Sequence, residues 1–365
     1  MKVQVKQEYL SKAVALVSRV ASVRATLPVL ANILLRTENG RLRLTATDLE
    51  VGLTTWIRAK IDVEGSFTVP ARLLVDFVSN NTDENLTLEQ VKETLKIVSE
   101  HHSVTMNGIP DTEFPLIPTL TGATEFTLPA ATVKDVIGQT LFAASIDDTR
   151  PVLAGVLFTA NEHILTIAAT DSYRLAERRV TLKDSVLQLR RIVPHRALAE
   201  LSRMLPADGE VKFSFMENQV QVQVDDRELV SRLIDGNYPD YQAIIPKAPI
   251  ASAIVNRKEL VDSVRLSSFF ARDSSNHVKI HVKETSIEIE AVSAQLGESR
   301  STLKVETTGE SLSVAFNAKF LLDVLNVMEG ETVSFEFSGP VQAALLTDAA
   351  LPDALFIVMP LRTEK

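Results

Sequence analysis

The sequence predicts an α+β protein made of three copies of one unit, each with two helices packed on antiparallel sheets. Three observations predict this fold class. Four different motifs recur about 123 residues further along the chain, runs of alternating apolar and polar residues indicate strands, and segments of helical period follow those runs. Unrelated motifs are not expected to recur at one nearly constant offset, so the repeat decides how the chain is organised.

The clearest repeat joins the end of a strand to the start of a helix. Val69–Leu74 recurs as Val193–Leu198 and, more loosely, as Phe316–Leu321. Each copy follows a strand-like run and opens a segment of helical period. Pro70 and Pro194 are predicted in the first helical turn, where a missing backbone N–H costs no hydrogen bond.

Three further repeats have nearly the same offset, about 122 to 124 residues. They match a strand end, a loop and a helix with their counterparts: Leu44–Leu49 with Ile167–Ser172, Glu113–Pro115 with Asn237–Pro239, and the helix around Val14–Val17 with that around Val136–Ile137. The third unit is more diverged, but it keeps the layout of two helices and several strands.

Each unit therefore contains two helices, and the chain contains six. We expect them at residues 8–20, 71–79, 131–143, 195–205, 256–272 and 317–328. Strands are predicted at Arg41–Thr45, Leu86–Leu88, Val211–Phe215 and Glu331–Phe337, with a hairpin turn at Asp225-Asp226-Arg227. Stretches containing Gly, Thr and Pro near Thr124 and Ala251 divide the chain into domains 1–124, 125–250 and 251–365.

The composition limits the class of protein. The 365 residues carry a net charge of −9 and no cysteine, which excludes disulfides, thiolate metal sites and a cysteine nucleophile. No apolar run approaches the ~18 residues of a membrane span, and the N-terminal residues lack the apolar core of a signal peptide. We therefore expect a soluble cytoplasmic protein without a uniformly basic surface.

Motifs of known catalytic chemistry are absent from the sequence. There is no glycine-rich phosphate loop, no Gly-x-Ser-x-Gly turn and no His-Glu-x-x-His helix. His277 and His281 fall on one alternating run, four residues apart and too distant to share a metal ion, and His101 and His102 are expected on opposite faces of a strand. The sequence predicts no enzyme, no metal site and no cofactor.

Paired carboxylates are the remaining candidates for chemistry. Asp147-Asp148 follows a helix and is interpreted as a loop, with a metal or acid–base site as the alternative. Asp225-Asp226 is interpreted as part of a turn. The repeated Thr47-Asp48 and Thr170-Asp171 end apolar strands, where their side chains are expected to cap the turn backbone, with an acid or base role as the alternative.

The six predicted helices are richer in basic residues than the rest of the chain. They contain about eleven Lys and Arg against about seven Asp and Glu, a balance of about +4 that leaves about −13 for the remainder. If the helices share one face, that face suits contact with a polyanion. Because no recognition-helix motif is present, we expect contact with phosphates without choice of base sequence.

Four segments, together with the threefold repeat, carry a resemblance to a known family. They are Arg24–Leu30, Thr170–Ala176, Tyr238–Tyr241 and the terminal Val358–Arg362. With them, essentially the whole chain resembles the bacterial DNA polymerase III β subunits, the sliding clamps. Pro151-Val152 stands where family members have a tyrosine pair, so an aromatic DNA contact is not carried over to this position.

The resemblance implies a non-catalytic processivity factor for DNA replication. Two chains would form a head-to-tail homodimer, a ring of six domains with helices around the hole and sheets outside. The ring would encircle double-stranded DNA, be loaded by an ATP-driven clamp loader, and tether the polymerase III α subunit and other proteins with clamp-binding motifs. Twelve helices at about 10 Å spacing leave a clear hole of roughly 28 Å, wide enough for a duplex.

The resemblance also implies three sets of functional residues. Phosphate contacts are predicted from Lys12, Arg24, Arg72, Arg150, Arg196 and Arg203. A partner-peptide pocket is predicted from Leu153, Thr170, Tyr173, Leu175, Pro239, Ile244, Phe320, Ile357, Met359, Pro360 and Leu361, with Arg174 and Arg362 at its rim. The dimer interface is predicted from Phe269 and Phe270 against Val104 and Met106 of the second chain. Adjacent helical aromatics point about 100° apart, so one is expected to pack inward and the other to face the partner.

Two other classes of function stay open from the residues alone. One is a metal-dependent DNA-processing enzyme with Asp147 and Asp148 as ligands, and the other is a structural repeat scaffold that does not bind nucleic acid. Magnesium-dependent nuclease activity would favour the first. Failure to retain DNA in any form would favour the second.

Overall fold

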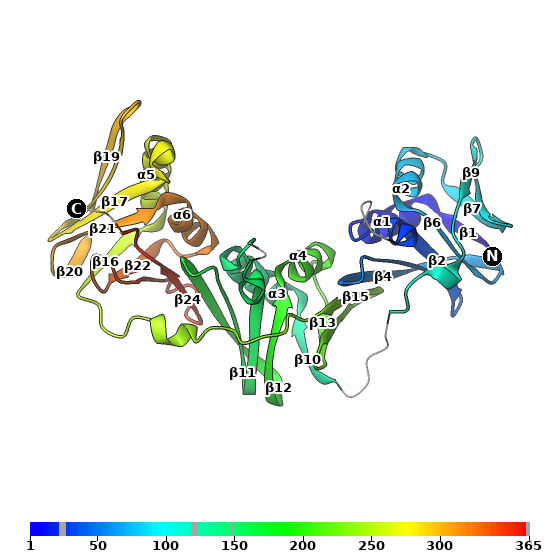
Figure 1. Ribbon diagram of the computed structural model, residues 1–365, viewed down its shortest axis with the longest axis horizontal. Coiled ribbons are helices and arrows are strands. Elements are labelled where there is room, and N and C mark those ends of the chain that lie inside the picture. The colour runs from blue at the N-terminus through cyan, green and yellow to red at the C-terminus, as the bar shows by residue number, and fades with distance from the viewer. Residues whose placement is uncertain (22–26, 118–122, 148, 363–365) are drawn as a thin grey trace. The chain divides into compact units, whose positions relative to one another are not determined.

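The computed structural model describes residues 1–21, 27–117, 123–147 and 149–362. The chain divides into two compact units, Met1–Val133 with Glu200–Leu233 and Lys134–Ala199 with Ile234–Lys365. Both units combine helices with antiparallel sheets, as Figure 1 shows. The predicted α+β class is therefore confirmed.

The first repeat has its two helices side by side, and α1 packs on β3 and β4. The helices are α1 (Gln7–Val17) and α2 (Ala71–Asn80). The strands are β1 (Lys2–Lys6), β2 (Asn32–Glu38), β3 (Arg41–Thr47), β4 (Val51–Arg58), β5 (Lys60–Val63), β6 (Ser66–Pro70), β7 (Asn85–Val91), β8 (Thr94–Val98) and β9 (Ser103–Asn107).

The middle and last repeats follow the same order of elements. The middle repeat contains β10 (Thr124–Pro129), α3 (Ala130–Thr140), β11 (Gly155–Thr170), β12 (Arg174–Pro194), α4 (His195–Met204), β13 (Glu210–Phe215), β14 (Gln219–Val224) and β15 (Arg227–Arg232). The last repeat contains β16 (Ala251–Asn256), α5 (Arg257–Ala271), β17 (His277–Lys283), β18 (Ser286–Ser293), β19 (Gly297–Lys304), β20 (Glu306–Gly309), β21 (Leu312–Asn317), α6 (Ala318–Val327), β22 (Thr332–Phe337), β23 (Ala344–Thr347) and β24 (Ala354–Val358).

Each of these helices starts directly where a strand ends. Pro70 is the last residue of β6 and the N-cap of α2, and Pro194 ends β12 immediately before α4. The prediction that these prolines lie inside the helices was wrong by one residue, because Pro70 has an extended ψ of 120°. In the last repeat Asn256 and Asn317 take this position, and their side chains accept backbone N–H groups of the first helical turn at 3.0 and 2.9 Å.

The predicted helix bounds lie within three residues of those observed. The predicted charge balance of the helices was too high, however. Arg19 and Arg272 fall just beyond the ends of α1 and α5, so the six helices hold nine basic and seven acidic residues, a balance of +2. None of the helices among the described residues is long and apolar enough to cross a bilayer.

Sheets continue from one repeat into the next. In the first unit β15 pairs antiparallel with β4, giving the strand order β10-β13-β14-β15-β4-β3-β2-β6. In the second unit β12 pairs with β24, giving β11-β12-β24-β23-β22-β16-β20. The two other sheets, β5-β1-β7-β8-β9 and β19-β18-β17-β21, have β9 and β19 at one edge and β5 and β21 at the other within the described chain.

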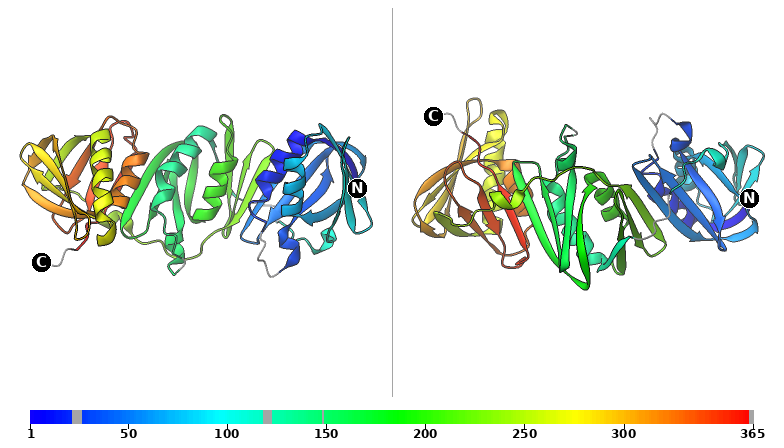
Figure 2. Two further views of the ribbon diagram at one scale, coloured as in Figure 1. Left: turned by 90° about the horizontal axis from the view of Figure 1, so that it is seen from above. Right: turned by 60° about the horizontal axis from the view of Figure 1, so that its bottom comes forward.

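The core lies between the helices and the sheets. Burial alternates along the strands, as in β14, where Val220, Val222 and Val224 are buried. In the first and last repeats the two helices pack beside one another over the strands, as Figure 2 shows. The period-two and helical patterns of the sequence therefore correspond to buried faces.

The repeated Thr-Asp pairs form tight turns between neighbouring strands. Asp48 Oδ1 accepts the backbone N–H groups two and three residues ahead, at 3.0 and 2.8 Å, and Asp171 Oδ1 accepts the same two groups, both at 2.9 Å. The residues after them, Leu49 and Ser172, have φ of 79° and 77°. In the last repeat the Ser293 hydroxyl alone accepts two backbone N–H groups. The capping prediction for both Thr-Asp pairs is confirmed.

Candidate functional site

An apolar cluster in the second unit contains the core of the predicted partner-peptide pocket. Leu153 precedes β11, Leu175 is the second residue of β12 and Ile357 lies near the end of β24, and all three side chains are buried together. Tyr238 and Tyr241, from the segment between β15 and β16, complete the cluster. Segments far apart in the sequence thus form one apolar floor.

Two tyrosine hydroxyls attach this segment to the sheet. The Tyr238 hydroxyl accepts the backbone N–H of Thr170 at 3.0 Å, and the Tyr241 hydroxyl donates to Glu177 at 2.6 Å. Glu177 is only 2% exposed, and its other oxygen pairs with Arg179 at 2.9 Å. Burial raises the pKa of both tyrosine hydroxyls well above the usual range, so both stay neutral at physiological pH.

These tyrosine anchors were not predicted from the sequence as site residues. The available signal was the repeat that matches Asn237–Pro239 with Glu113–Pro115, which marks the segment but not its hydrogen bonds. Phe142 and Asp323 were not predicted either, because no motif includes them. Both contact Arg174.

Arg174 lies inside the site, although the sequence placed it at the rim. Its guanidinium lies 5.4 and 4.8 Å from the ring centroids of Phe142 and Phe320. It also pairs with Asp171 at 3.1 Å and with Asp323. The side chain is only 11% exposed, and the two carboxylates and two rings offset the cost of burying its charge. Arg174 therefore holds the Thr-Asp turn of the middle repeat against α6.

Exposed apolar side chains cover the buried floor. Tyr173 is 54% exposed and stacks on Phe320 with ring centroids 5.9 Å apart. The Met359 backbone N–H donates to the Tyr173 carbonyl, and the Leu361 N–H donates to the Ala315 carbonyl, both at 2.8 Å. Pro239, Ile244 and Arg362 are exposed, while Met359, Pro360 and Leu361 are partly buried. The C-terminal segment thus runs beside the turn that carries Tyr173, where the sequence predicts the partner-peptide pocket.

The equivalent surface in the first unit is polar. Arg232 donates its backbone N–H to the Glu50 carbonyl at 2.9 Å, which matches the bond from Met359 to Tyr173. The side chains of Arg232 and Glu50 form an ion pair at 3.3 Å, where the second unit has two apolar side chains. The exposed apolar surface is therefore a property of the junction between the middle and last repeats.

The predicted phosphate-binding residues are exposed cations where the structure describes them. Arg24 lies outside the described residues. Lys12 and Arg203 pair with Glu8 and Glu200, each at 2.5 Å. The Lys12–Glu8 pair is exposed on both sides and therefore weak, whereas Glu200 is nearly buried beside the exposed Arg203. Arg72 and Arg196 are also exposed, on α2 and α4.

Arg150 is exposed and lies just before β11, beside the turn that carries Tyr173, and not on one of the six α-helices. Its guanidinium donates to the Ser172 hydroxyl at 3.0 Å and to the Asp171 carbonyl at 3.4 Å. Both acceptors belong to the turn that carries Tyr173. A ligand that contacts Tyr173 from this side would therefore meet a positive charge.

The predicted interface residues differ in exposure. Phe269 is 47% exposed, with the Arg272 guanidinium 5.3 Å from its ring centroid, whereas Phe270 is partly buried. On β9, Val104 is partly buried and Met106 is completely buried. The Met106 side chain belongs to the core, which leaves only its backbone for a partner.

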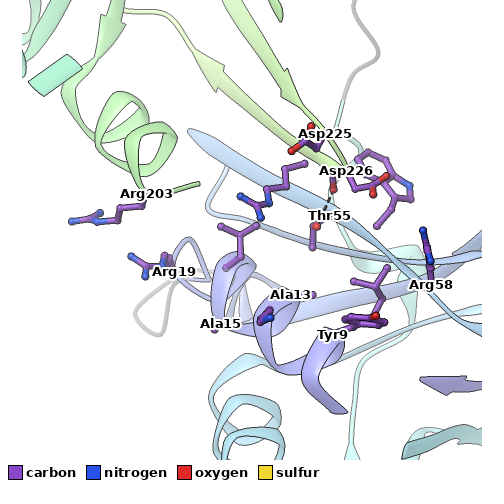
Figure 3. A pocket seen from close by; sticks show the side chains of 14 residues that line it. Tyr9, Ala13, Ala15, Arg19, Thr55, Arg58, Arg203, Asp225 and Asp226 are labelled. Carbon is purple, nitrogen blue, oxygen red and sulfur yellow. Dashed lines mark hydrogen bonds between the residues drawn. The ribbon is translucent and has the colours of Figure 1, made fainter. Parts of the chain in front are cut away.

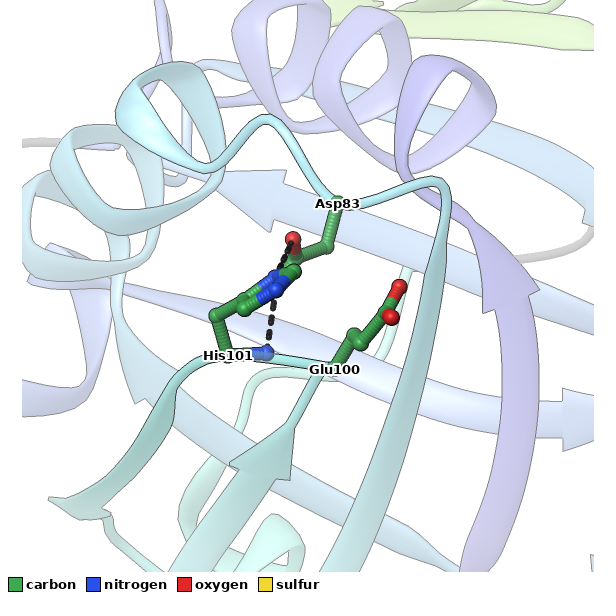
Figure 4. A group of neighbouring side chains, drawn as sticks. All are labelled: Asp83, Glu100 and His101. Carbon is green, nitrogen blue, oxygen red and sulfur yellow. Dashed lines mark hydrogen bonds and ion pairs between the residues drawn. The ribbon is translucent and has the colours of Figure 1, made fainter.

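Three potential metal ligands, Asp83, Glu100 and His101, meet at the turn between β8 and β9 (Figure 4). The prediction that His101 and His102 lie on a strand was wrong, because both fall in this turn. The His101 ring and backbone N–H bond the Asp83 carboxylate at 2.7 and 2.9 Å. Hydrogen bonds from Ser99 and His101 hold the pKa of Asp83 well below its usual range. These bonds tie the turn to the segment after α2, and they account for the grouping without an ion.

Asp147 also forms a local turn. Its carboxylate accepts the Thr149 backbone N–H at 2.9 Å, and its own N–H donates to the Ser145 hydroxyl at 3.0 Å. This favours the loop interpretation over a metal or acid–base site. Asp148 lies outside the described residues.

Comparison with known proteins assigns the chain to a family. Models of the N-terminal, central and C-terminal domains of the DNA polymerase III beta subunit match residues 1–118, 127–240 and 242–362. The beta sliding clamp of Escherichia coli K12 is 31% identical over 365 residues, which cover 99% of this chain and 100% of that protein. The chain belongs to the DNA polymerase III beta subunit family. The beta sliding clamp of Chlamydia pneumoniae is 30% identical, with 99% of both chains covered.

Solved structures of family members have the same fold. The DNA polymerase sliding clamp of Bacillus subtilis matches with a TM-score of 0.97 at 28% identity, over 100% of both chains. The clamp of Pseudomonas aeruginosa bound to griselimycin matches with a TM-score of 0.95 at 29% identity, again over 100% of both chains. As a member of this family the chain is a DNA sliding clamp, a non-catalytic processivity factor built from three clamp domains.

Proposed function

We propose that two copies of this chain close a ring around duplex DNA and that the pocket of the second unit tethers a DNA polymerase to it. The building blocks are the domains 1–124, 125–250 and 251–365, three from each copy. The observation that carries the proposal is that the edge strands β9 and β19 each lack a partner on one side within the described chain. Neighbouring repeats are joined by the strand pairs β15 with β4 and β24 with β12. A third junction of this kind, between two copies, would pair β9 with β19.

The two junctions within the chain use the same backbone bonds. In the first, Trp56 and Arg232 donate the terminal N–H groups at 3.0 and 2.9 Å, and in the second, Arg179 and Met359 donate them, both at 2.8 Å. Five residue pairs lie between the terminal bonds in each case. A third junction between two copies is therefore expected to have the same length and register.

The register follows when residue pairs are traced through each sheet from the strands that precede the two helices of a repeat. By this correspondence β9 matches β15 and β24, and β19 matches β4 and β12. The proposed pairs between copies are Ser103 with Arg300, Val104 with Ser299, Thr105 with Glu298 and Met106 with Gly297. An edge with free N–H and C=O groups is a ready template for such pairing.

Exposed apolar side chains accompany β19. Leu266 and Phe269 on α5, Val292 on β18 and Leu296 before β19 are all exposed, and α5 packs on both strands. Grouped exposed apolar residues mark interaction surfaces. The proposed interface therefore combines this group and Phe270 with Val104 and with the backbone at Met106.

The proposed contact with DNA is electrostatic. Lys12, Arg24, Arg72, Arg150, Arg196 and Arg203 are the proposed phosphate-binding residues. Phosphate contacts hold a duplex without reading its sequence, and they weaken as salt increases. This suits a ring that must slide, because no contact depends on one base pair.

The proposed ligand of the pocket is a short extended peptide with large apolar side chains. A buried apolar floor with exposed Tyr173 and Ile244 and a partly buried Met359 offers separate positions for such side chains. The proposed partners are the α subunit of DNA polymerase III, clamp-loader subunits and other proteins with a clamp-binding motif. The assembly is placed in the cytoplasm, with the DNA.

A cysteine pair tests the ring. The chain has no cysteine, so Val104→Cys with Ser299→Cys adds the only two thiols. In the proposed register these residues face each other between hydrogen-bonded pairs, where Cα atoms are about 4.5 Å apart and a disulfide fits. Oxidation should join two chains into a covalent dimer on a non-reducing gel. Val104→Cys with Thr302→Cys, three residues out of register, should not cross-link. Chains with the matched pair that stay monomeric would contradict the proposal.

A further inference from the structure

We propose that the first unit contains a second ligand site, which binds a nucleoside phosphate. The site is a cavity of about 720 Å³ between α1, β4, the end of α4 and the turn that joins β14 to β15 (Figure 3). Cavities of ~300–1,000 Å³ are typical of small-molecule sites. The cavity belongs to the first unit, whereas the partner-peptide pocket belongs to the second.

The cavity has more positive charge than its own acids neutralise. Arg19 and Arg58 line it and have no ion-pair partner among the described residues. Of the two aspartates in the lining, Asp226 is already paired with Arg41 at 2.5 Å. Only Asp225 remains to offset the guanidinium groups of Arg19, Arg58 and Arg227, the last of which also donates to the Met204 carbonyl. The surplus favours an anionic ligand.

Cations stand at both ends of the cavity. Figure 3 shows Arg19 and Arg203 at one end and Arg58 at the other. Arg203 is exposed but already pairs with the nearly buried Glu200, so it contacts the ligand only by sharing its guanidinium with that partner. One guanidinium group can donate two parallel N–H bonds to two phosphate oxygens. Two arginines at one end therefore suit a chain of phosphates.

The wall between the cations is apolar. Leu16 and Ile57 contribute aliphatic side chains, Ala13 and Ala15 leave room beside α1, and Tyr9 contributes an exposed ring. An aromatic ring beside aliphatic groups is a surface on which a nucleobase stacks. Inorganic phosphate would use only the cations, and an apolar molecule only the wall. A nucleoside phosphate uses both, whether it is free or part of a DNA strand.

Trp56 provides a reporter for this site. It is the only tryptophan in the chain and lines the cavity. Its ring nitrogen donates to Glu38 at 2.8 Å, and the Arg41 and Arg43 guanidinium groups lie 5.8 and 5.5 Å from its ring centroid. Since the ring is held in place, a change in its fluorescence on titration reports on the cavity.

The test is a fluorescence titration of the full chain with ATP, adenosine and inorganic tripolyphosphate, checked by equilibrium dialysis. ATP should give a saturable change, adenosine none, and tripolyphosphate should compete more weakly than ATP. Arg19→Ala and Arg58→Ala should each weaken ATP binding about tenfold, the loss expected for one charge-assisted hydrogen bond. Arg36→Ala removes an exposed arginine on β2 that does not line the cavity and should leave ATP binding unchanged.

The base contact is tested separately. Tyr9→Ala should weaken ATP binding about tenfold, whereas Tyr9→Phe keeps the ring and should bind as the unaltered chain does. Competition by a short oligothymidylate would show that a strand nucleotide also enters the site, which supports the same chemistry. No saturable ATP binding, or equal affinities for ATP and tripolyphosphate, would overturn the proposal. Free ATP needs no ring, so Thr105→Pro, a substitution on β9 that should give a monomer, should bind ATP like the unaltered chain. ATP binding is therefore tested independently of whether the chain forms a ring.

Discussion

The hydroxyl of Tyr238 accepts the backbone N–H of Thr170 at 3.0 Å. Both groups are buried, and Thr170 opens the turn that carries Tyr173 and Arg174. This bond therefore fixes the turn against the segment that leads to the last repeat. The exposed surface of the peptide pocket depends on where that turn is held.

Tyr238→Phe should weaken both the fold and the pocket. The substitution leaves the buried Thr170 N–H without an acceptor, which costs about 1–3 kcal/mol of the free energy of unfolding. Urea unfolding measures that loss, and fluorescence anisotropy of a labelled clamp-binding peptide measures the expected fall in affinity. Tyr173→Phe removes an exposed hydroxyl and should leave stability unchanged. Unaltered unfolding and peptide binding in Tyr238→Phe would show that the bond does not anchor the turn.

Arg174→Met should destabilise the second unit strongly. The cation is nearly buried, and its loss leaves the carboxylates of Asp171 and Asp323 uncompensated, at a cost of about 3 kcal/mol. Arg232→Met is the matched control, because it breaks the exposed pair with Glu50 in the first unit and should cost less than about 1 kcal/mol. Both values come from denaturant unfolding of the full chain. Similar losses in the two variants would mean that burial of Arg174 has no energetic consequence.

Thr105→Pro should give a folded monomer. Ser99 donates its N–H to the His102 carbonyl, and Gly108 donates its N–H to the Glu93 carbonyl. In the β8–β9 register, these bonds mean that the even-numbered residues of β9 bond β8. The Thr105 N–H therefore points to the free edge. Proline there removes one bond of the proposed junction without removing a bond inside the sheet. Sedimentation velocity measures the change from dimer to monomer. Thr105→Val keeps the N–H and should stay dimeric; a dimeric proline variant would place the interface elsewhere.

Asp83 should make the first unit sensitive to acid. Hydrogen bonds from Ser99 and His101 lower its pKa in the folded state, so it contributes stability above the ordinary aspartate pKa of about 3.9 and loses it as pH falls toward the folded value. Asp83→Asn should therefore be less stable than the unaltered chain at pH 7, and the difference should narrow below about pH 4. Thermal unfolding across this range provides the measurement. Glu100→Gln, at an exposed neighbour, should have the unaltered pH profile, and an Asp83→Asn curve parallel to that of the unaltered chain would refute the assignment.

Local features of this fold could be predicted from the sequence. The threefold repeat, the six helices and the capped turns at Asp48 and Asp171 all depend on residues close in the chain, and the structure confirms them. Apolar spacing and the chemistry of turns act over a few residues, which is why their signal survives in the sequence alone.

Features that depend on tertiary pairing could not be predicted in the same way. The burial of Arg174 requires Phe142 and Asp323, which are brought to it only by the packing of α6 and of the turn that follows α3. The free edge of β9 and the full burial of Met106 follow from sheet order. The cavity beside Tyr9 is formed by elements of two repeats, so no single segment of the sequence indicates it.

Retention of a covalently closed dimer on circular DNA tests the ring most directly. Chains with Val104→Cys and Ser299→Cys are mixed with a nicked circular plasmid, oxidised, and washed in about 1 M salt, which removes proteins held by charge alone. A ring linked to the circle predicts that the dimer stays with the plasmid through the wash and is released when the plasmid is cut once. Release by salt from the intact circle, or retention on the cut plasmid, would contradict it.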